Sequence, residues 1–246
     1  MQTVNVLCIK WGRKYGPEYV NRLHSMVQRH MTRPFRFICL CDDKEGIDAG
    51  IDVRPIPAVG FGPFDKREAW SFGHGWLKLT SFADPLYDLQ GPTLFLDLDI
   101  VIVDNIDCFF DHPGSFCVIR EWDKQDGTGN TSVYRFAIGA HADALAHLKD
   151  GFPGSIADVR NEQEYITQFL GRQDKVAFWP TGWCVSFKRH CVPRGLMSWF
   201  KPPTIPPGAK IIAFHGKPNP PDAIDGVSGK WYRRVPPTPW VAEHWR

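Results

Sequence analysis

The stretch that most constrains the fold runs from Thr93 to Asp107, TLFLDLDIVIVDNID. Apolar residues precede and follow Asp97 and Asp99, a pattern typical of a strand that is buried on both faces of a parallel sheet. Because side chains along a strand repeat their direction every two residues, Asp97 and Asp99 are expected to point the same way. A buried aspartate needs a charged or hydrogen-bonding partner. The stretch therefore predicts a strand that carries a functional pair of acids.

The pair of acids suits a hard divalent cation. Mg²⁺ and Mn²⁺ prefer oxygen ligands and usually complete their coordination with substrate phosphates. We therefore expect a metal ion and a nucleotide diphosphate beside Asp97 and Asp99. In the alternative interpretation, one aspartate caps a turn and the other is a solvated strand end. The acids interrupt an apolar run and not a loop rich in glycine, proline and serine, which favours the metal site.

Length and composition limit the class of protein. A chain of 246 residues with 43% hydrophobic content can bury a full core, and a net charge of +2 argues against a general nucleic-acid binder. No apolar run of about 18 residues is present, and Lys10 comes too early for a signal-peptide core, so we expect a soluble cytosolic protein. Seven cysteines without a CxxC pair indicate reduced, buried thiols.

The first forty residues predict a βαβ unit. A buried strand at 4–9 is followed by a loop, by a helix that begins at Pro17, and by a second strand at 35–40. Ligands of open α/β sheets bind beyond the carboxyl ends of the strands. The loop from Lys10 to Tyr15, together with Asp42 and Asp43, is therefore expected to meet a nucleotide, with Lys10, Trp11, Tyr15 and Asp42 as the candidate contacts. The alternative is a solvated basic loop followed by a turn cap.

The segment LFLDLDIVIVDNID resembles the DxD strand of GT-A-fold glycosyltransferases that use nucleotide sugars. It is most similar to the family-8 group, which includes glycogenin and bacterial galactosyltransferases. The resemblance covers residues 4–218 and implies a single GT-A-like α/β domain over 1–218, with a mixed, mostly parallel sheet flanked by helices. Residues 219–246, rich in proline and tryptophan, are expected to form an extended tail packed on this domain.

The resemblance also implies roles for residues outside the DxD strand. It assigns Lys78, on a helix expected at 76–83, to the donor diphosphate and Asn130 to the donor sugar. The sequence HGKP matches a shortened form of the family's closing motif. By that match His215 is the third metal ligand, Gly216 allows close approach to a phosphate and Lys217 neutralises the diphosphate. The alternatives are an exposed lysine, a turn asparagine and a histidine that merely satisfies its hydrogen bonds.

The segment NEQEY at 161–165 matches the family's D-Q-D-type element near the anomeric carbon of the donor. Glu162, Gln163 and Glu164 are therefore the candidates for catalysis, although glutamate stands where the family has aspartate. The alternative is structural, because Asn161 is a good helix N-cap and Glu164 stands at the reciprocal position of a capping box.

Several further elements follow from periodicity and turn signals. Residues 52–75 are turn-rich and predict a binding loop. Trp179 and Trp183 could form a platform for an acceptor sugar. We expect helices at 142–148 and 161–170, and strands at 116–120, 176–179, 183–187 and 210–214.

Together these features predict a metal-dependent glycosyltransferase that uses Mn²⁺ or Mg²⁺ and moves a sugar from a nucleotide diphosphate donor, expected to be a UDP-sugar, to a glycan or other hydroxyl acceptor. The resemblance implies retention of configuration, and an inverting enzyme would need one of the three candidate residues as general base. The tail residues Trp231, Tyr232, Trp240 and Trp245, among basic residues, could touch the inner face of an anionic membrane that carries a lipid-linked acceptor.

Two other functions fit parts of the sequence. A DxD phosphatase would use Asp97 as nucleophile and Asp99 as acid and base, but such enzymes place a loop directly after the second aspartate, where the apolar run here continues to Val103. A carbohydrate-binding module would use the tryptophans for stacking and the acids for structural Ca²⁺, but it gives no role to the βαβ start or to Lys78 and His215.

Overall fold

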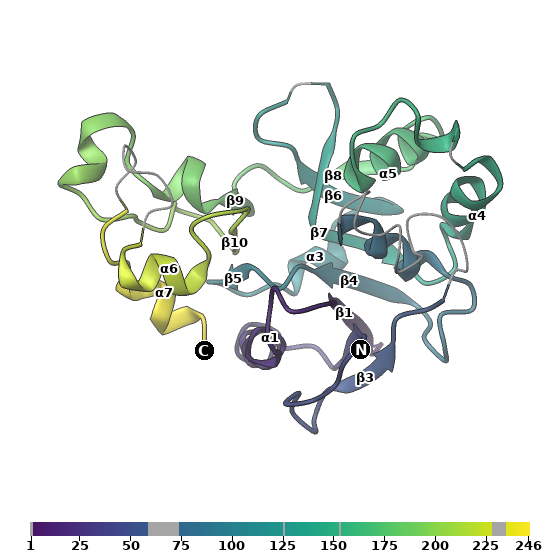
Figure 1. Ribbon diagram of the computed structural model, residues 1–246, viewed down its shortest axis with the longest axis horizontal. Helices are drawn as coiled ribbons and strands as arrows, with labels where there is room; N and C mark the ends of the chain where they lie inside the picture. Colours follow the sequence, from purple (N-terminus) through teal and green to yellow (C-terminus); the bar gives the residue numbers. More distant parts are fainter. Residues whose placement is uncertain (1, 59–73, 125, 153, 228–234) are drawn as a thin grey trace.

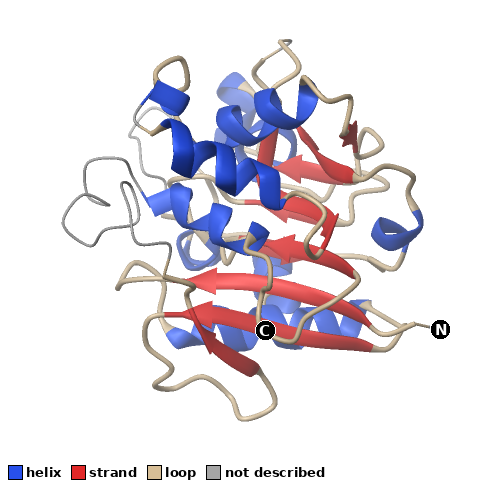
Figure 2. Cartoon of the chain, turned by 90° about the vertical axis from the view of Figure 1, so that its right-hand side faces the viewer, coloured by secondary structure: helices blue, strands red, loops and turns tan. Residues whose placement is uncertain are grey.

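The computed structural model describes residues 2–58, 74–124, 126–152, 154–227 and 235–246. A seven-stranded sheet with the order β3-β2-β1-β4-β7-β6-β8 forms its centre, and a three-stranded sheet with the order β5-β10-β9 lies beside it (Figure 1). Helices cover both faces of the large sheet (Figure 2). The strands are β1 Val4–Lys10, β2 Phe35–Cys41, β3 Asp52–Pro55, β4 Pro92–Leu96, β5 Ile100–Ile102, β6 Phe116–Arg120, β7 Gly129–Ala137, β8 Val176–Phe178, β9 Cys184–Ser186 and β10 Ile211–Ala213.

The helices confirm most of the predicted positions. The helix expected at 76–83 is a 3-10 helix that begins two residues earlier. The α-helices are α1 Pro17–His30, α3 Cys108–Asp111, α4 Ala142–Gly151, α5 Glu162–Gly171, α6 Pro220–Asp225 and α7 Pro239–His244. Short 3-10 or π turns are η2 His74–Phe82, η3 Gly154–Ile156, η4 Phe187–Cys191 and η5 Gly195–Trp199.

The large sheet is mixed and mostly parallel, as predicted. Strands β3, β2, β1 and β4 run parallel, β7 runs antiparallel to both of its neighbours, and β6 pairs with β8 in parallel. Alternate residues of each central strand enter different cores. Leu94 and Leu96 pack on the α1 side, while Phe95 packs on the side of η2, α4 and α5. Burial on both faces explains the continuous apolar runs in the sequence.

The predicted single strand over Thr93–Asp107 is wrong beyond Leu96. The chain leaves the large sheet at Asp97, turns at Leu98 and Asp99, and enters the small sheet as β5, antiparallel to β10. The apolar residues of β5 are buried because they pack between α1 and β10. Their burial gives the same sequence pattern as a continued central strand, so periodicity alone does not reveal the break.

The tail at 219–246 is helical in part and not extended as predicted. Its helices α6 and α7 pack on each other, and Trp245 is buried with its ring 5.1 Å from that of Tyr19 on α1. The Arg22 guanidinium lies 4.0 Å from the centre of the Trp245 ring, and Trp240 Nε1 donates to Pro203 O at 3.0 Å. Of the stretch 52–75 that was predicted to be a turn-rich loop, the first four residues form β3, and residues 59–73 lie outside the described residues, as do the tail residues Trp231 and Tyr232.

The remaining expectations about the whole chain concern cysteines and membrane spans. All seven cysteines are free, and every one except the partly buried Cys108 is buried, as predicted. Within the described ranges, none of the helices has the length and apolar character needed to cross a bilayer.

Candidate active site

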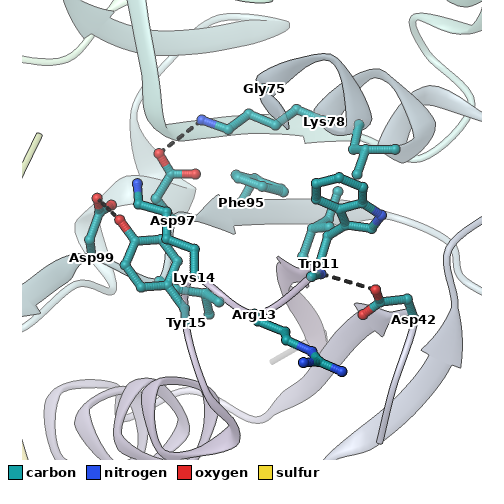
Figure 3. A pocket seen from close by; sticks show the side chains of 14 residues that line it. Trp11, Arg13, Lys14, Tyr15, Asp42, Gly75, Lys78, Phe95, Asp97 and Asp99 are labelled. Atoms are coloured by element: carbon teal, nitrogen blue, oxygen red, sulfur yellow. Dashed lines mark hydrogen bonds and ion pairs between the residues drawn. The ribbon is translucent and has the colours of Figure 1, made fainter. Parts of the chain in front are cut away.

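A cavity of about 740 Å³ opens at the carboxyl ends of β1 and β4, where open α/β sheets usually bind ligands (Figure 3). The loop after β1, the start of η2 and the turn after β4 form its walls. Its lining combines one aromatic patch with both signs of charge, which suits a ligand that has a flat ring and a phosphate. The lining residues are Ile9, Trp11, Gly12, Arg13, Lys14, Tyr15, Asp42, Gly75, Leu77, Lys78, Phe95, Asp97, Leu98 and Asp99.

Lys78 and Asp97 form an ion pair inside this cavity (Figure 3). Lys78 Nζ lies 2.8 Å from Asp97 Oδ2 and donates to Thr131 O at 3.1 Å. Burial alone lowers the pKa of Lys78, but Asp97 and then Glu162 outweigh burial and raise the pKa. The ammonium is therefore charged at neutral pH and fixed at the side of Asp97. The resemblance of the DxD segment had assigned this lysine to the donor diphosphate.

Asp99, the other acid of the pair, has a different partner. The Tyr15 phenol donates to Asp99 Oδ2 at 2.6 Å. Burial, followed by the nearby charge of Asp97, raises the pKa of Asp99 to about 6. The same burial raises the pKa of Tyr15, so the phenol keeps its proton and remains a donor. The cavity thus holds two carboxylates that are only partly compensated by Lys78 and Tyr15.

This surplus of negative charge fits a divalent cation at Asp97 and Asp99. Oxygen donors are what Mg²⁺ and Mn²⁺ prefer, and a cation would relieve the electrostatic penalty that raises the pKa of Asp99. Within the described parts of the chain, however, no three His, Cys, Asp or Glu side chains form a group that could hold a metal ion. The structure therefore brings two of the three predicted ligands together.

The third predicted ligand, His215, is next to the site along the backbone but its side chain is engaged elsewhere. The amide of Phe214 donates to Asp99 O at 2.9 Å, so the chain reaches His215 directly beside the DxD turn. The His215 ring stacks on Trp122 with centroids 5.5 Å apart, and Nε2 lies 2.6 Å from Ser186 Oγ. Burial and then Lys188 lower the pKa of His215, so the imidazole is neutral at neutral pH.

The loop after β1, which was predicted to meet a nucleotide, contributes much of the cavity wall. Trp11 and Tyr15 line the cavity, and Asp42 accepts a hydrogen bond of 3.0 Å from the amide of Gly12, which fixes the loop to the end of β2 (Figure 3). Lys10 does not line the cavity. It is buried, and its Nζ donates a hydrogen bond of 3.4 Å to Asp43 O.

Glu162 lies at the edge of the same cavity. Its Oε1 is 3.9 Å from Lys78 Nζ and accepts a hydrogen bond of 3.3 Å from Thr131 Oγ1. Gly75, which lines the cavity, comes so close that a Cβ atom there would be 2.3 Å from Glu162 Oε2. The absence of a side chain at position 75 therefore leaves the Glu162 carboxylate room beside the cavity.

Glu121 was not predicted, yet it connects two residues that were. Its Oε2 accepts hydrogen bonds from Asn130 Nδ2 at 3.2 Å and from Gln163 Nε2 at 3.4 Å. Asn130 also accepts from the amide of Ser132 with its own carbonyl oxygen. The two predicted amides thus share one carboxylate, which orients both. Glu121 follows a strand and precedes Trp122, a position with no signal in periodicity or spacing.

Glu164 faces away from this group and is held by two cations. Its carboxylate pairs with Arg160 and Lys124, and hydrogen bonding from Arg160 lowers its pKa to about 2 despite burial. Asn161 caps α5 by accepting from the amide of Glu164 at 3.0 Å, as predicted. The return bond of the capping box differs: Glu164 Oε2 accepts from the amide of Arg160 and not of Asn161.

The remaining predicted residues lie outside the cavity lining. Gly216 has a φ of +70°, which favours glycine, and the Lys217 ammonium lies 3.5 Å from Asp222 at the start of α6. Trp179 is buried and donates to Val133 O, so it is a core residue and not part of a sugar platform. Trp183 packs on Phe109 at 5.3 Å. The lining residues that the sequence did not single out are Ile9, Gly75, Leu77, Phe95 and Leu98.

Comparison with known proteins gives a likeness in structure. No protein-family model matches the chain, and no curated protein matches its sequence. Among solved structures, the galactosyltransferase LgtC in complex with donor and acceptor sugar analogues is similar, with a TM-score of 0.58, 13% identity and 88% of each chain covered. An active-site mutant of LgtC has a TM-score of 0.57 and 12% identity, with 88% of this chain and 89% of that chain covered. The chain therefore has the GT-A fold of the galactosyltransferase LgtC, as the resemblance of its DxD segment predicted.

Proposed function

We propose that this protein is a glycosyltransferase that moves a sugar from a nucleotide diphosphate donor, a UDP-sugar, to a hydroxyl of a glycan acceptor. The observation that carries the proposal is the cavity at the ends of β1 and β4, where Asp97, Asp99 and Lys78 converge below an aromatic wall. The fold supports this function, because LgtC is a galactosyltransferase that binds donor and acceptor sugar analogues. It gives no support to the phosphatase or to the carbohydrate-binding module.

In the proposed donor site, different walls of the cavity contact different parts of the donor. Trp11 offers a flat face for the base, and Asp42 and the backbone of the loop after β1 lie beside it. Asp97 and Asp99 would hold Mn²⁺ or Mg²⁺, which when bound supplies positive charge to the diphosphate. Lys78 adds a fixed positive charge at the same end of the cavity. Lys217 belongs to the proposal as a second cation for the diphosphate, and Gly216 as the point of backbone approach.

The chemistry requires negative charge on the departing nucleoside diphosphate to be neutralised. Lys78 is suited to this task because it is charged and hydrogen-bonded in place before any ligand binds. Glu162 and Gln163 are the proposed residues on the anomeric side, with Asn130 oriented toward the donor sugar by Glu121. The active site of LgtC has been studied with a glutamine-to-glutamate exchange, which supports a role for an amide such as Gln163. Among the three candidates for catalysis, Glu164 has the least support, because its ion pairs suit a structural role.

The proposed acceptor and location follow the same reasoning. The acceptor is a glycan or a lipid-linked hydroxyl, and the proposed location is the cytoplasm at the inner face of the membrane. Seven free cysteines are typical of a reducing compartment. In the tail, Trp240 and Trp245 pack on the protein and are not available to lipid, so any membrane contact of the tail would use Trp231 and Tyr232, outside the described residues.

The proposal is tested by calorimetric titration of UDP, GDP and ADP into the protein, each with Mn²⁺ and with EDTA. Tight binding of UDP in Mn²⁺ alone is expected, and Asp97→Asn or Asp99→Asn should abolish it without unfolding the chain. Asp104→Asn is the matched control, since this aspartate is more exposed and pairs with Lys210 outside the cavity. Unchanged affinity in either site variant, or absence of binding by a folded protein, would reject the proposed site.

A further inference from the structure

The segment from Cys191 to Thr204 forms a closed loop that leaves the small sheet after β9 and η4. Its base is closed by a hydrogen bond of 3.0 Å from the Thr204 amide to Cys191 O. Inside the loop, Ser198 is buried and donates to Gly195 O at 2.9 Å, and the amide of Lys201 donates to Met197 O at 2.9 Å. The backbone of the loop therefore has a defined shape, the bright green segment at the left edge of Figure 1.

Three large apolar side chains of this loop are exposed. Phe200 is 82% exposed, Trp199 is 47% exposed and Met197 is 45% exposed, so most of the large exposed apolar side chains in the described residues are in one turn. Leaving a phenylalanine in water forgoes the free energy that its burial would provide. A group of such residues on one rigid turn is typical of an interaction surface and not of scattered surface apolar residues.

The sequence segment that contains this turn has basic and no acidic residues, although several of its basic residues pair with acids from elsewhere in the chain, as Arg189 does with Asp123 and Lys210 with Asp104. No aspartate or glutamate occurs between Lys175 and Pro221, although the chain as a whole has 27 acidic and 29 basic residues. Arg194 and Lys201 flank the apolar turn and are exposed, and within the described ranges no acidic side chain pairs with either. The other basic residues of this acid-free segment are Lys175, Lys188, Arg189, Lys210 and Lys217.

We propose that the turn at 194–201 docks on an anionic lipid surface, with Met197, Trp199 and Phe200 inserted at the level of the headgroups and Arg194 and Lys201 on the lipid phosphates. Aromatic residues are favoured at that depth, and basic residues near an anionic surface add electrostatic attraction. A nucleic acid would use the charges, but it would leave Met197 and the strongly exposed Phe200 without a role.

The turn is linked to the candidate active site through the small sheet. Lys188, on η4 directly before the loop, donates a hydrogen bond to His215 O. The amide of the neighbouring residue Phe214 donates to Asp99 O. A docked turn would therefore hold the small-sheet side of the cavity near the membrane surface. That orientation suits a lipid-linked acceptor, and this extension rests on the proposed transferase function. The proposed docking of the turn on a lipid surface does not depend on that function.

Co-sedimentation tests the surface with vesicles of phosphatidylcholine alone and of phosphatidylcholine mixed with phosphatidylserine, without nucleotide or metal. We expect sedimentation with the mixed vesicles only. Phe200→Ser should lower the partition coefficient by about tenfold, and Arg194→Glu with Lys201→Glu by at least about 25-fold. Phe200→Leu keeps an apolar side chain and should keep binding. Lys201→Glu alone should lower the partition coefficient by at least about fivefold, and Lys149→Glu, on the exposed side of α4, is the matched charge control for this single variant.

Each of the following outcomes would contradict the proposed docking of the turn on an anionic lipid surface. Absence of sedimentation with both kinds of vesicle would exclude docking, and equal binding to neutral vesicles would exclude the role of Arg194 and Lys201. An equal loss for Lys149→Glu and for Lys201→Glu would mean that only the overall charge matters. Because the assay contains no nucleotide, a failure here leaves the nucleotide titration of the transferase proposal as a separate result.

Discussion

The phenol of Tyr15 donates a hydrogen bond of 2.6 Å to the Asp99 carboxylate, although the two residues are 84 positions apart. This bond ties the loop after β1 to the turn after β4, and it leaves the two acids of the DxD turn in different states. Asp97 has the Lys78 ammonium at 2.8 Å, whereas the partner of Asp99 is a neutral phenol. Asp99 should therefore carry most of the electrostatic cost of placing two carboxylates in one cavity.

The first prediction concerns this cost. The pKa of Asp99 is raised from 3.8 to about 6, so the folded protein binds its proton more tightly than the unfolded chain does. The contribution of Asp99 to folding stability should therefore rise as the pH falls from 7 toward 4. Asp99→Asn, which cannot ionise, should stabilise the protein by about 2–3 kcal/mol at neutral pH in EDTA, and the gain should fade near pH 4. Urea unfolding of both proteins across this pH range measures it.

Asp104→Asn is the control of opposite sign for the same titration. Hydrogen bonding from Lys210 lowers the pKa of Asp104, so its charge contributes stability at neutral pH, and that contribution is lost as the pH falls through its folded pKa. This variant should be slightly less stable than the wild type at neutral pH. If Asp99→Asn behaves like Asp104→Asn, Asp99 does not bear an electrostatic penalty.

The second prediction concerns Lys78, which stands between Asp97 and Glu162. Lys78→Met leaves the partly buried Asp97 without its cation and should lower stability by about 1–3 kcal/mol, the cost of leaving such a group without its partner. Adding Asp97→Asn should restore part of this loss, because the unpaired charge is removed. A double-mutant cycle measured by urea unfolding gives the coupling. Effects that add within about 0.5 kcal/mol would mean that the pair does not interact.

Burial patterns and local capping in the sequence predicted the βαβ start and most helices, and the resemblance of the DxD segment predicted the mixed sheet. It failed where the chain changes sheets: β4 and β5 read as one apolar run, although Asp97 ends one sheet and Ile100 begins another. It also missed Glu121, whose role comes from two amides that are distant along the chain. Long-range contacts of this kind leave no periodic signal in one sequence.

The third prediction separates Glu162 from Glu164. Glu164→Gln should lower stability by about 1–2 kcal/mol at neutral pH, since it weakens the contacts with Arg160 and Lys124. Because the folded pKa of Glu164 is about 2, below its usual 4.5, this stabilisation is present above pH 4.5 and is lost as the pH falls toward 2. Thermal unfolding across that range checks it. Sugar transfer measured at a permissive temperature should survive the change.

Glu162→Gln should have the reverse profile, with sugar transfer lost and stability nearly kept, because Thr131 and Lys78 remain next to the new amide. The same comparison includes Gly75→Ala, whose Cβ would press on Glu162, with Gly171→Ala as a control that has open space. Loss of transfer in Glu164→Gln but not in Glu162→Gln would reverse the assignment of the two glutamates.

The fourth prediction concerns the third proposed metal ligand. His215 Nε2 is occupied by Ser186 Oγ at 2.6 Å, and the ring lies on Trp122, so binding a metal at Asp97 and Asp99 would require the imidazole to leave Ser186. Ser186→Ala removes this competing bond and should raise the affinity for Mn²⁺ severalfold, whereas His215→Ala should lower it by about tenfold or more. Burial keeps the pKa of His215 low, so protonation should not compete with metal binding at neutral pH.

Titration of Mn²⁺ by electron paramagnetic resonance, without nucleotide, measures the metal affinity of the wild type and of the two variants. Equal affinities in the three would leave Asp97 and Asp99 as the protein's ligands and assign His215 to the packing of Trp122.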